Sequence, residues 1–138
     1  MSKVKVITDS TSDIPKELVQ DLNITVVPLK VHFGDETFTD GESITAEEFY
    51  RKLVVSEIFP TTSQPSPVDF EQAYRQAVEE GYTEILSIHL SSALSGTYQS
   101  AVMAKERLDH EKVRIEVVDS KTATYAIGNL VVRAARAA

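Results

Sequence analysis

Near the start of the chain, Val4-Lys5-Val6-Ile7-Thr8 is followed by Asp9-Ser10-Thr11-Ser12-Asp13, and these ten residues give the first indication of the fold class. The first half is rich in β-branched residues, which favour a strand, whereas the second half is a cluster of residues that favour turns and helix caps. Pro15 then suits the first turn of a helix with Leu18, Val19 and Leu22 on its apolar face. The chain therefore begins with a strand, a polar loop and a helix.

This order of strand, polar loop and helix recurs along the chain. It predicts a three-layer α/β/α fold with a mainly parallel sheet covered on both faces, to which a turn at residues 34–36 adds a small β-hairpin. We find no internal repeat and no linker, and 138 residues suit one core, so we expect a single domain over residues 1–138. The expected strands are residues 4–8, 24–27, 29–33, 37–39, 84–90 and 113–118.

Capping residues mark several of the expected helices. Thr45 and Glu48 have the spacing of a capping box, and the buried side of the short helix that follows would hold Phe49 and Leu53, with Tyr50 as a further candidate. Residues 61–67 are expected to form a loop, in which Ser66 and Pro67 begin the next helix. The apolar positions of the later helices are Phe70, Ala73, Tyr74 and Ala77, then Tyr98, Ala101, Val102 and Leu108 before a stop at Asp109-His110, and finally Ile127, Leu130, Val131 and Ala134.

Composition excludes several functions. Fourteen Lys and Arg against 21 Asp and Glu give a formal charge of −7, which disfavours nucleic acid as a partner. The chain has no cysteine, so disulfides, thiolate metal sites and cysteine nucleophiles are ruled out. The amino terminus lacks the pattern of an export signal, and no apolar run approaches the roughly 18 residues of a membrane span. We expect a cytoplasmic protein whose contacts with membranes are transient.

Four polar segments hold the candidate binding groups: residues 9–13, 61–66, 91–97 and 119–124. Ligands of open α/β sheets bind beyond the carboxyl ends of the strands, where such loops meet. Hydroxyl groups beside helix amino termini can hold a carboxylate or phosphate without a lysine, although each Ser or Thr could also serve only as a cap. Gly96 could let the backbone approach a ligand or could serve packing.

The sequence offers little support for catalysis. Asp9 follows a strand, as in aspartyl phosphotransfer enzymes, but the second acid of that pattern would fall at position 11, which is a threonine. Nucleophile-elbow, zinc-protease and P-loop motifs do not occur. Phosphoryl or acyl transfer through Asp9 or Ser95 stays an alternative, as does a scaffold domain without a ligand.

The three histidines do not form a recognisable metal or catalytic set. His89 stands near Ser91 in sequence, but alternation along its strand favours a buried, hydrogen-bonded ring over a catalytic base. His32 and His110 are expected at the periphery. We therefore expect no metal and no cofactor.

Four segments in order make the chain similar to the DegV family. They are Ile7 to Asp13, Thr62-Ser63-Gln64-Pro65-Ser66, Ser91-Ser92-Ala93-Leu94-Ser95-Gly96-Thr97-Tyr98, and Val118-Asp119-Ser120. Phe33-Gly34-Asp35-Glu36 and Asp40-Gly41 lie between the first two. The resemblance covers essentially the whole chain, but it corresponds to the amino-terminal domain of the family, whose second domain is absent from these residues.

The resemblance implies a cytosolic bacterial carrier and not an enzyme. Such a carrier binds a long-chain fatty acid and presents the carboxylate to a separate fatty acid kinase, which makes acyl phosphate for phospholipid synthesis. Thr62 and Ser95 would contact the carboxylate, and the acyl chain would run into the apolar interior, where each methylene contributes roughly 0.8 kcal/mol. The surroundings would be built by Ser63, Ser92, Gly96 and Thr97, with Asp9, Ser10, Gln64 and Ser91 as further candidates.

Overall fold

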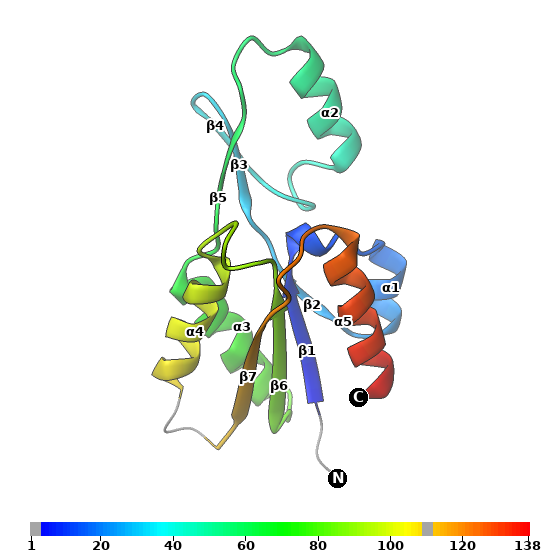
Figure 1. Ribbon diagram of the computed structural model, residues 1–138, viewed down its shortest axis with the longest axis vertical. Helices are drawn as coiled ribbons and strands as arrows, with labels where there is room; N and C mark the ends of the chain where they lie inside the picture. Colours follow the sequence, from blue (N-terminus) through cyan, green and yellow to red (C-terminus); the bar gives the residue numbers. More distant parts are fainter. Residues whose placement is uncertain (1–3, 109–111) are drawn as a thin grey trace.

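The computed structural model describes residues 4–108 and 112–138 and contains two sheets (Figure 1). The main sheet is parallel throughout and has the strand order β2-β1-β6-β7. The expected helix stop at Asp109-His110 lies outside the described residues. The strands are β1 (Val4–Asp9), β2 (Thr25–Val27), β6 (Glu84–His89) and β7 (Arg114–Asp119).

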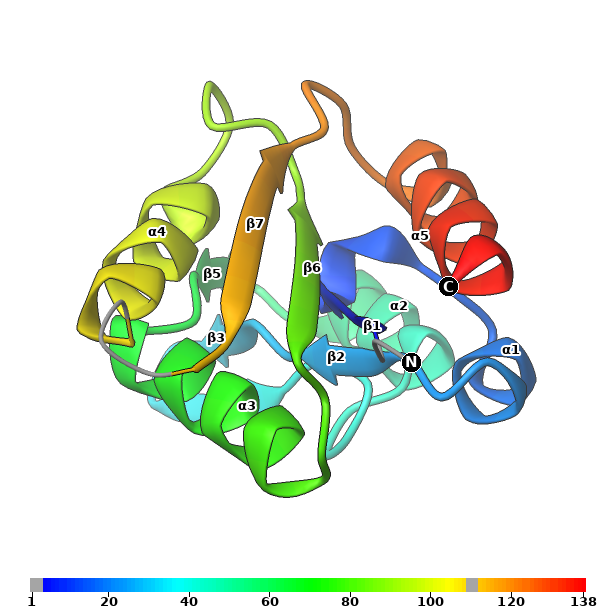
Figure 2. The same ribbon diagram turned by 90° about the horizontal axis from the view of Figure 1, so that it is seen from below.

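Helices cover both faces of the main sheet, which confirms the three-layer prediction. Figure 2 shows α3 (Pro67–Glu79) and α4 (Thr97–Arg107) on one side of the strands. On the other side lie α1 (Lys16–Asp21) and α5 (Tyr125–Ala137). None of the helices in the described part of the chain is long and apolar enough to cross a membrane.

Neighbouring residues of β1 supply the two cores, because successive strand side chains point to opposite faces. Ile7 is fully buried in a cluster with Phe70 and Tyr74 of α3. Val6 belongs to the other cluster, together with Ile127 and Val131 of α5. The strand predicted first from the sequence therefore organises both layers of helices.

The second sheet is larger than the predicted hairpin. It has the order β4-β3-β5, with β3 (Lys30–Phe33), β4 (Glu36–Thr39) and β5 (Thr61–Ser63) paired antiparallel. The prediction that residues 61–67 form a loop was wrong for the first three of them. A three-residue polar strand carries no periodic signal of its own, and it forms here because β3 offers a free edge.

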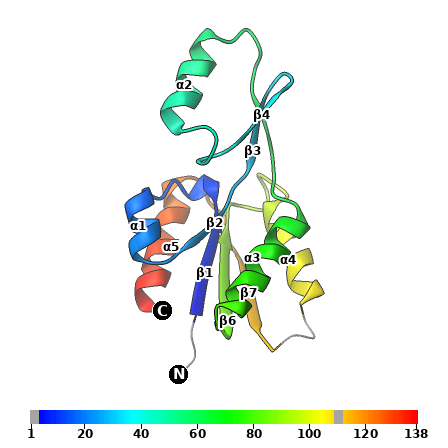
Figure 3. The ribbon, with the colours of Figure 1, turned by 180° about the vertical axis from the view of Figure 1, so that it is seen from behind.

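Helix α2 (Ala46–Val55) lies beside the second sheet, beyond the carboxyl ends of the main strands (Figure 3). Thr45 and Glu48 make the predicted capping box. The predicted burial of Leu53 was wrong, because 37% of this residue is exposed. Tyr50 is likewise exposed, whereas Phe49 packs partly against the small core around Phe33.

Helix α5 is rotated relative to the expectation. Ile127 and Val131 are buried as predicted, whereas Leu130 is 42% exposed, so its predicted burial was wrong. The reason lies at Gly128, where an added β-carbon would collide with the carbonyl oxygen of Ser12. The helix therefore rests its glycine face on the 3-10 turn Ser10–Ser12, and Leu130 is turned toward solvent.

Candidate functional site

A pocket of about 320 Å³ lies where the carboxyl ends of the main strands meet the second sheet. We call it the carboxyl-end pocket. The parallel strands β1 and β6 bring their following loops to this edge, and β3 and β5 close the opposite side. The pocket is lined by Thr11, Leu29, Val31, Asp40, Thr62, Gln64, Leu90, Leu94 and Ser95.

Three of the four predicted polar segments meet in this pocket. Thr11 comes from residues 9–13, Thr62 and Gln64 come from residues 61–66, and Ser95 comes from residues 91–97. The fourth segment, residues 119–124, contributes no lining residue. Side chains more than 80 positions apart in the sequence therefore share one cavity.

Gly96 joins two of these segments. A β-carbon at Gly96 would lie 2.5 Å from Nε2 and 2.8 Å from Oε1 of Gln64. The missing side chain therefore lets the amide of Gln64 lie directly against the loop that carries Ser95. Of the two roles considered for Gly96, close approach to a ligand and packing, the structure shows packing, and the contact is with a residue that lines the pocket.

The hydroxyl of Ser95 is fixed by Thr97. The Oγ atom of Ser95 accepts a hydrogen bond from the Thr97 amide at 3.2 Å and lies 2.9 Å from Oγ1 of Thr97, which is fully buried. When Thr97 donates in both bonds, the proton of Ser95 is free for a ligand. Thr62 is likewise free to donate, because its hydroxyl has no hydrogen-bond partner among the described residues.

Ser92 and Ser91 act inside their own loop. The Ser92 hydroxyl donates to Oδ2 of Asp119 at 2.5 Å, and this bond is the main reason why the pKa of Asp119 lies below its ordinary value. The Ser91 hydroxyl accepts from the amide of Ala93 at 3.2 Å. Ser92 thus ties the segment 91–97 to the segment 119–124, and neither serine lines the pocket.

Two other candidates point away from the carboxyl-end pocket. The Oγ atom of Ser63 lies 2.8 Å from Nε2 of His32, on the other face of β5 from Thr62. The Oγ atom of Ser10 accepts from the amide of Leu29 at 3.0 Å. Ser63 therefore belongs to the outer face of the second sheet, and Ser10 fastens the turn after β1 to the chain that enters β3.

Asp9 is fully buried and does not line the pocket. Its Oδ2 atom accepts from Nδ1 of His89 at 2.9 Å and from the amide of Leu90 at 3.3 Å. Burial by itself raises the pKa of Asp9, but the hydrogen bonds from His89 and Thr11 outweigh burial and hold the pKa below its ordinary value. A buried carboxylate with these partners is not presented as a nucleophile, which disfavours transfer chemistry through Asp9.

The prediction of a buried, hydrogen-bonded His89 is confirmed. The ring is fully buried, and its Nε2 atom lies 2.5 Å from Oγ of Ser87, which also accepts from the hydroxyl of Tyr74 at 2.8 Å. The pairing of His89 with Asp9 was not predicted. Ser87 and His89 stand two positions apart in β6, and this spacing of polar residues in an otherwise apolar strand is the signal that could have revealed the network.

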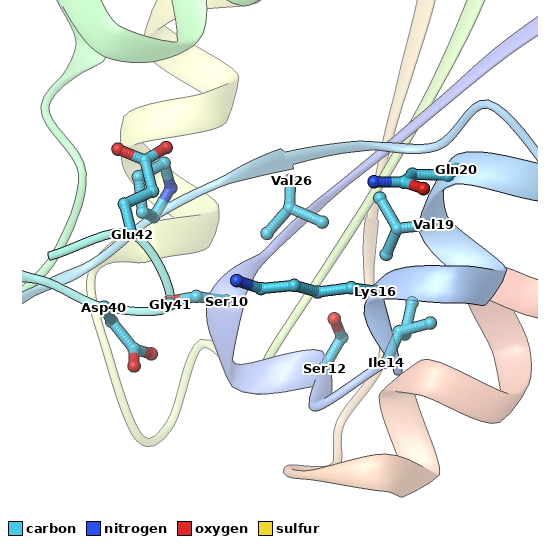
Figure 4. Close-up of a pocket in the computed structure, with 11 residues that line it drawn as sticks. Ser10, Ser12, Ile14, Lys16, Val19, Gln20, Val26, Asp40, Gly41 and Glu42 are labelled. Carbon is cyan, nitrogen blue, oxygen red and sulfur yellow. The ribbon is translucent and has the colours of Figure 1, made fainter. Parts of the chain in front are cut away.

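A second pocket of about 240 Å³ adjoins the first, and Asp40 lines both (Figure 4). Ile14, Val19 and Val26 form its apolar wall, and Lys16 extends across it toward the segment around Gly41. Of the candidate residues, Ser10 lines this second pocket, whereas Thr62 and Ser95 line only the carboxyl-end pocket. In the described ranges, no group of three or more His, Asp or Glu side chains could hold a metal ion.

The parallel sheet and the hydroxyl-lined pocket at its carboxyl edge define an α/β domain of the kind that binds small molecules. The family model described as "Uncharacterised protein, DegV family" matches residues 3–138. The chain belongs to the DegV family, as the four sequence segments predicted.

Known relatives are similar in sequence over nearly the whole length of this chain. A DegV domain-containing protein of Caldanaerobacter subterraneus is 44% identical over 138 residues, which are all of this chain and 48% of that protein. One from Clostridium perfringens is 40% identical over 99% of this chain and 48% of its own length. The chain thus spans about half the length of the curated relatives that it matches.

Solved structures share the fold. A DegV family protein from Thermus thermophilus, described by its fatty acid binding, has a TM-score of 0.87 at 42% identity and is matched over 97% of this chain and 46% of its own. DegV of Bacillus subtilis, a fatty acid binding protein, has a TM-score of 0.91 at 32% identity over 99% and 47%. A stearic acid-binding protein from Eubacterium ventriosum has a TM-score of 0.90 at 33% identity over 97% and 47%.

Proposed function

We propose that this chain binds a long-chain fatty acid with the carboxylate in the carboxyl-end pocket. The observation that carries the proposal is the meeting of Thr62, Gln64 and Ser95 above an apolar wall, in a family whose solved members include fatty acid binding proteins. A carboxylate needs hydrogen-bond donors, and a fatty acid needs apolar surface next to them. The pocket combines both.

The head group would rest on neutral donors. Among the described residues that line the pocket there is no lysine or arginine, so the hydroxyls of Thr62 and Ser95 and the amide of Gln64 would supply the hydrogen bonds. Ser95 directly precedes Gly96, the N-cap residue of α4, and the eleven residues of this helix place the positive end of a helix dipole beside the pocket. Short-range donors of this kind outweigh the net charge of the whole chain, because distant charges are screened beyond about 8 Å at physiological salt.

The acyl chain would begin along Leu29, Val31 and Leu90, which are all buried. Leu94 is 66% exposed at the rim and would gain contacts only when a ligand or a covering segment lies over it. A pocket of about 320 Å³ stands at the lower end of the size range for small-molecule sites. We therefore expect this chain to cover only part of a long acyl chain and to hold it more weakly than a two-domain relative.

As a cytoplasmic carrier, the protein would present the bound carboxylate to a separate fatty acid kinase, which forms the acyl phosphate. The chain itself would supply no catalytic group. Both ring nitrogens of His89 already have partners, so this histidine is not placed to act as a base for Ser95. The single domain over residues 1–138 would serve as the part of the carrier that holds the head group.

Extraction of the purified chain with organic solvent and mass spectrometry of the extract tests the binding. Fatty acid in a near-stoichiometric amount is expected after incubation with a mixture of long-chain acids. A folded chain that retains none, and that shows no binding by calorimetry, would contradict the proposal. Incubation with ATP, Mg²⁺ and fatty acid, without an added kinase, should give no acyl phosphate, and turnover by the chain alone would overturn the carrier role.

A further inference from the structure

Four fully buried polar side chains form a continuous hydrogen-bonded network through the core under α3. The hydroxyl of Tyr74 donates to Oγ of Ser87 at 2.8 Å, Ser87 lies 2.5 Å from Nε2 of His89, and Nδ1 of His89 lies 2.9 Å from Oδ2 of Asp9. The ring of Phe70 packs edge-on against His89, with ring centroids 4.8 Å apart. This hydrogen-bonded network ends at Asp9, next to the carboxyl-end pocket.

The direction of these bonds follows from the partners. The pKa of Asp9 lies below its ordinary value, so the carboxylate only accepts, and Nδ1 of His89 must donate to it. The hydroxyl of Ser87 accepts from Tyr74, and its contact with Nε2 of His89 completes the network, so each of the four side chains has a partner.

Asp9 connects the hydrogen-bonded network to two residues that line the pocket. Its Oδ1 atom accepts from both the amide and the hydroxyl of Thr11, and the amide bond measures 2.9 Å. Its Oδ2 atom accepts from the amide of Leu90 as well as from His89. Thr11 belongs to the turn after β1, and Leu90 lies in the segment after β6, so one carboxylate joins the two loops on the main-sheet side of the pocket.

We infer that His89 is a positioning residue for ligand binding, which acts through Asp9 to fix Thr11 and Leu90 in the carboxyl-end pocket; this inference rests on the proposed function. Stability alone is a poor reason for such a network, because buried polar groups pay for their desolvation and apolar side chains of equal volume pack as well. A fixed carboxylate, in contrast, defines the distance between the two loops.

Two substitutions of His89 separate its two bonds. In His89→Asn, the amide nitrogen of the new side chain lies near the position of Nδ1 and can still donate to Asp9. In His89→Gln, the amide nitrogen lies near the position of Nε2, so Asp9 loses its side-chain donor at this position. We expect His89→Asn to bind a long-chain fatty acid nearly as the wild type does, and His89→Gln to bind about tenfold more weakly, the effect of one lost hydrogen bond to a charged group.

Thr8→Val is the matched control. Thr8 is also fully buried, and its hydroxyl donates to the carbonyl of Ile88 at 2.8 Å, in the same pair of strands but outside the pocket. Thr8→Val should lose stability without losing affinity. If His89→Gln does not fold, Thr11→Val tests the same link, because it removes the hydroxyl bond to Asp9 and should weaken binding in the same way.

NMR of the ¹⁵N-labelled histidines supplies a readout that a purely structural role would not move. The chain has only three histidines, so His32→Gln and His110→Gln assign the signals. The ring signals of His89 should shift when fatty acid saturates the wild type. A wild type that binds no fatty acid contradicts the proposed function. A different outcome overturns only this inference. In that outcome, the wild type binds fatty acid, the ring signals of His89 do not shift, and folded His89→Gln or Thr11→Val binds with unchanged affinity.

Discussion

Thr62 and Ser63 are neighbours in β5, yet Thr62 lines the carboxyl-end pocket while the hydroxyl of Ser63 lies 2.8 Å from His32 on the opposite face. Alternation of strand side chains produces this separation. The DegV resemblance implied that Ser63 builds the surroundings of the ligand, whereas the structure turns it away from the pocket. The two residues therefore form a natural pair for mutagenesis.

Thr62→Val removes a hydroxyl that has no partner among the described residues. We expect fatty acid affinity to fall about tenfold and the unfolding free energy to change by less than about 0.5 kcal/mol. Ser63→Ala should leave affinity unchanged. Calorimetric titration of both variants with the same fatty acid checks the prediction, and an equal loss in both would place the head group elsewhere.

Ser95→Ala should weaken fatty acid binding by roughly 1.5–3 kcal/mol, because a charge-assisted hydrogen bond to the carboxylate is lost. Stability should suffer less, since the first turn of α4 has no side-chain cap from Gly96 and loses only the local bonds with Thr97. Denaturant midpoint and affinity are measured on one sample.

Ser66→Ala gives the comparison for Ser95. Ser66 caps α3 in a capping box with Asp69 and does not line the pocket. Its loss should cost roughly 0.5–2 kcal/mol of stability and no affinity. Ser95→Ala would be only a capping variant if it behaved in the same way.

Gly96→Ala places a β-carbon 2.5 Å from the amide nitrogen of Gln64. The side chain of Gln64 must then move, so we expect weaker binding and a loss of stability of about 1 kcal/mol. In the double variant Gln64→Ala/Gly96→Ala the collision is absent. Its two effects on stability should therefore not add, and a double-mutant cycle measures this coupling. Strict additivity would show that the contact carries no energy.

Asp9→Asn should change how stability depends on pH. The pKa of Asp9 is lowered from 3.8 by the folded structure, so the carboxylate stabilises the fold at pH values above the ordinary pKa and loses this effect as pH falls through the folded pKa. We expect Asp9→Asn to cost about 1.5–3 kcal/mol at pH 7 and progressively less below about pH 4. Urea denaturation at pH 7 and pH 3 measures the difference. A cost that is independent of pH would mean that the charge of Asp9 is not what stabilises the fold.

Local patterns in the sequence determined the main architecture. The alternation of β-branched strands with capped helices predicts the parallel sheet and both helical layers, because hydrophobic periodicity and caps act over a few neighbouring residues. The capping box predicted at Thr45 and the helix start predicted at Ser66 and Pro67 both appear. The polar segments after β1 and β6 also predict the edge at which the pocket lies, since parallel strands end together.

Tertiary structure alone decided the composition of the pocket. β5 exists because it pairs with β3, about thirty positions earlier, and this pairing turns Thr62 inward and Ser63 outward. The bond from His89 to Asp9 spans 80 positions. Such contacts depend on the order of the strands in each sheet and on which faces pack together. Local sequence patterns predict neither of these. The sequence thus predicted three of the loops that line the pocket, and the fold decided which of their hydroxyls face it.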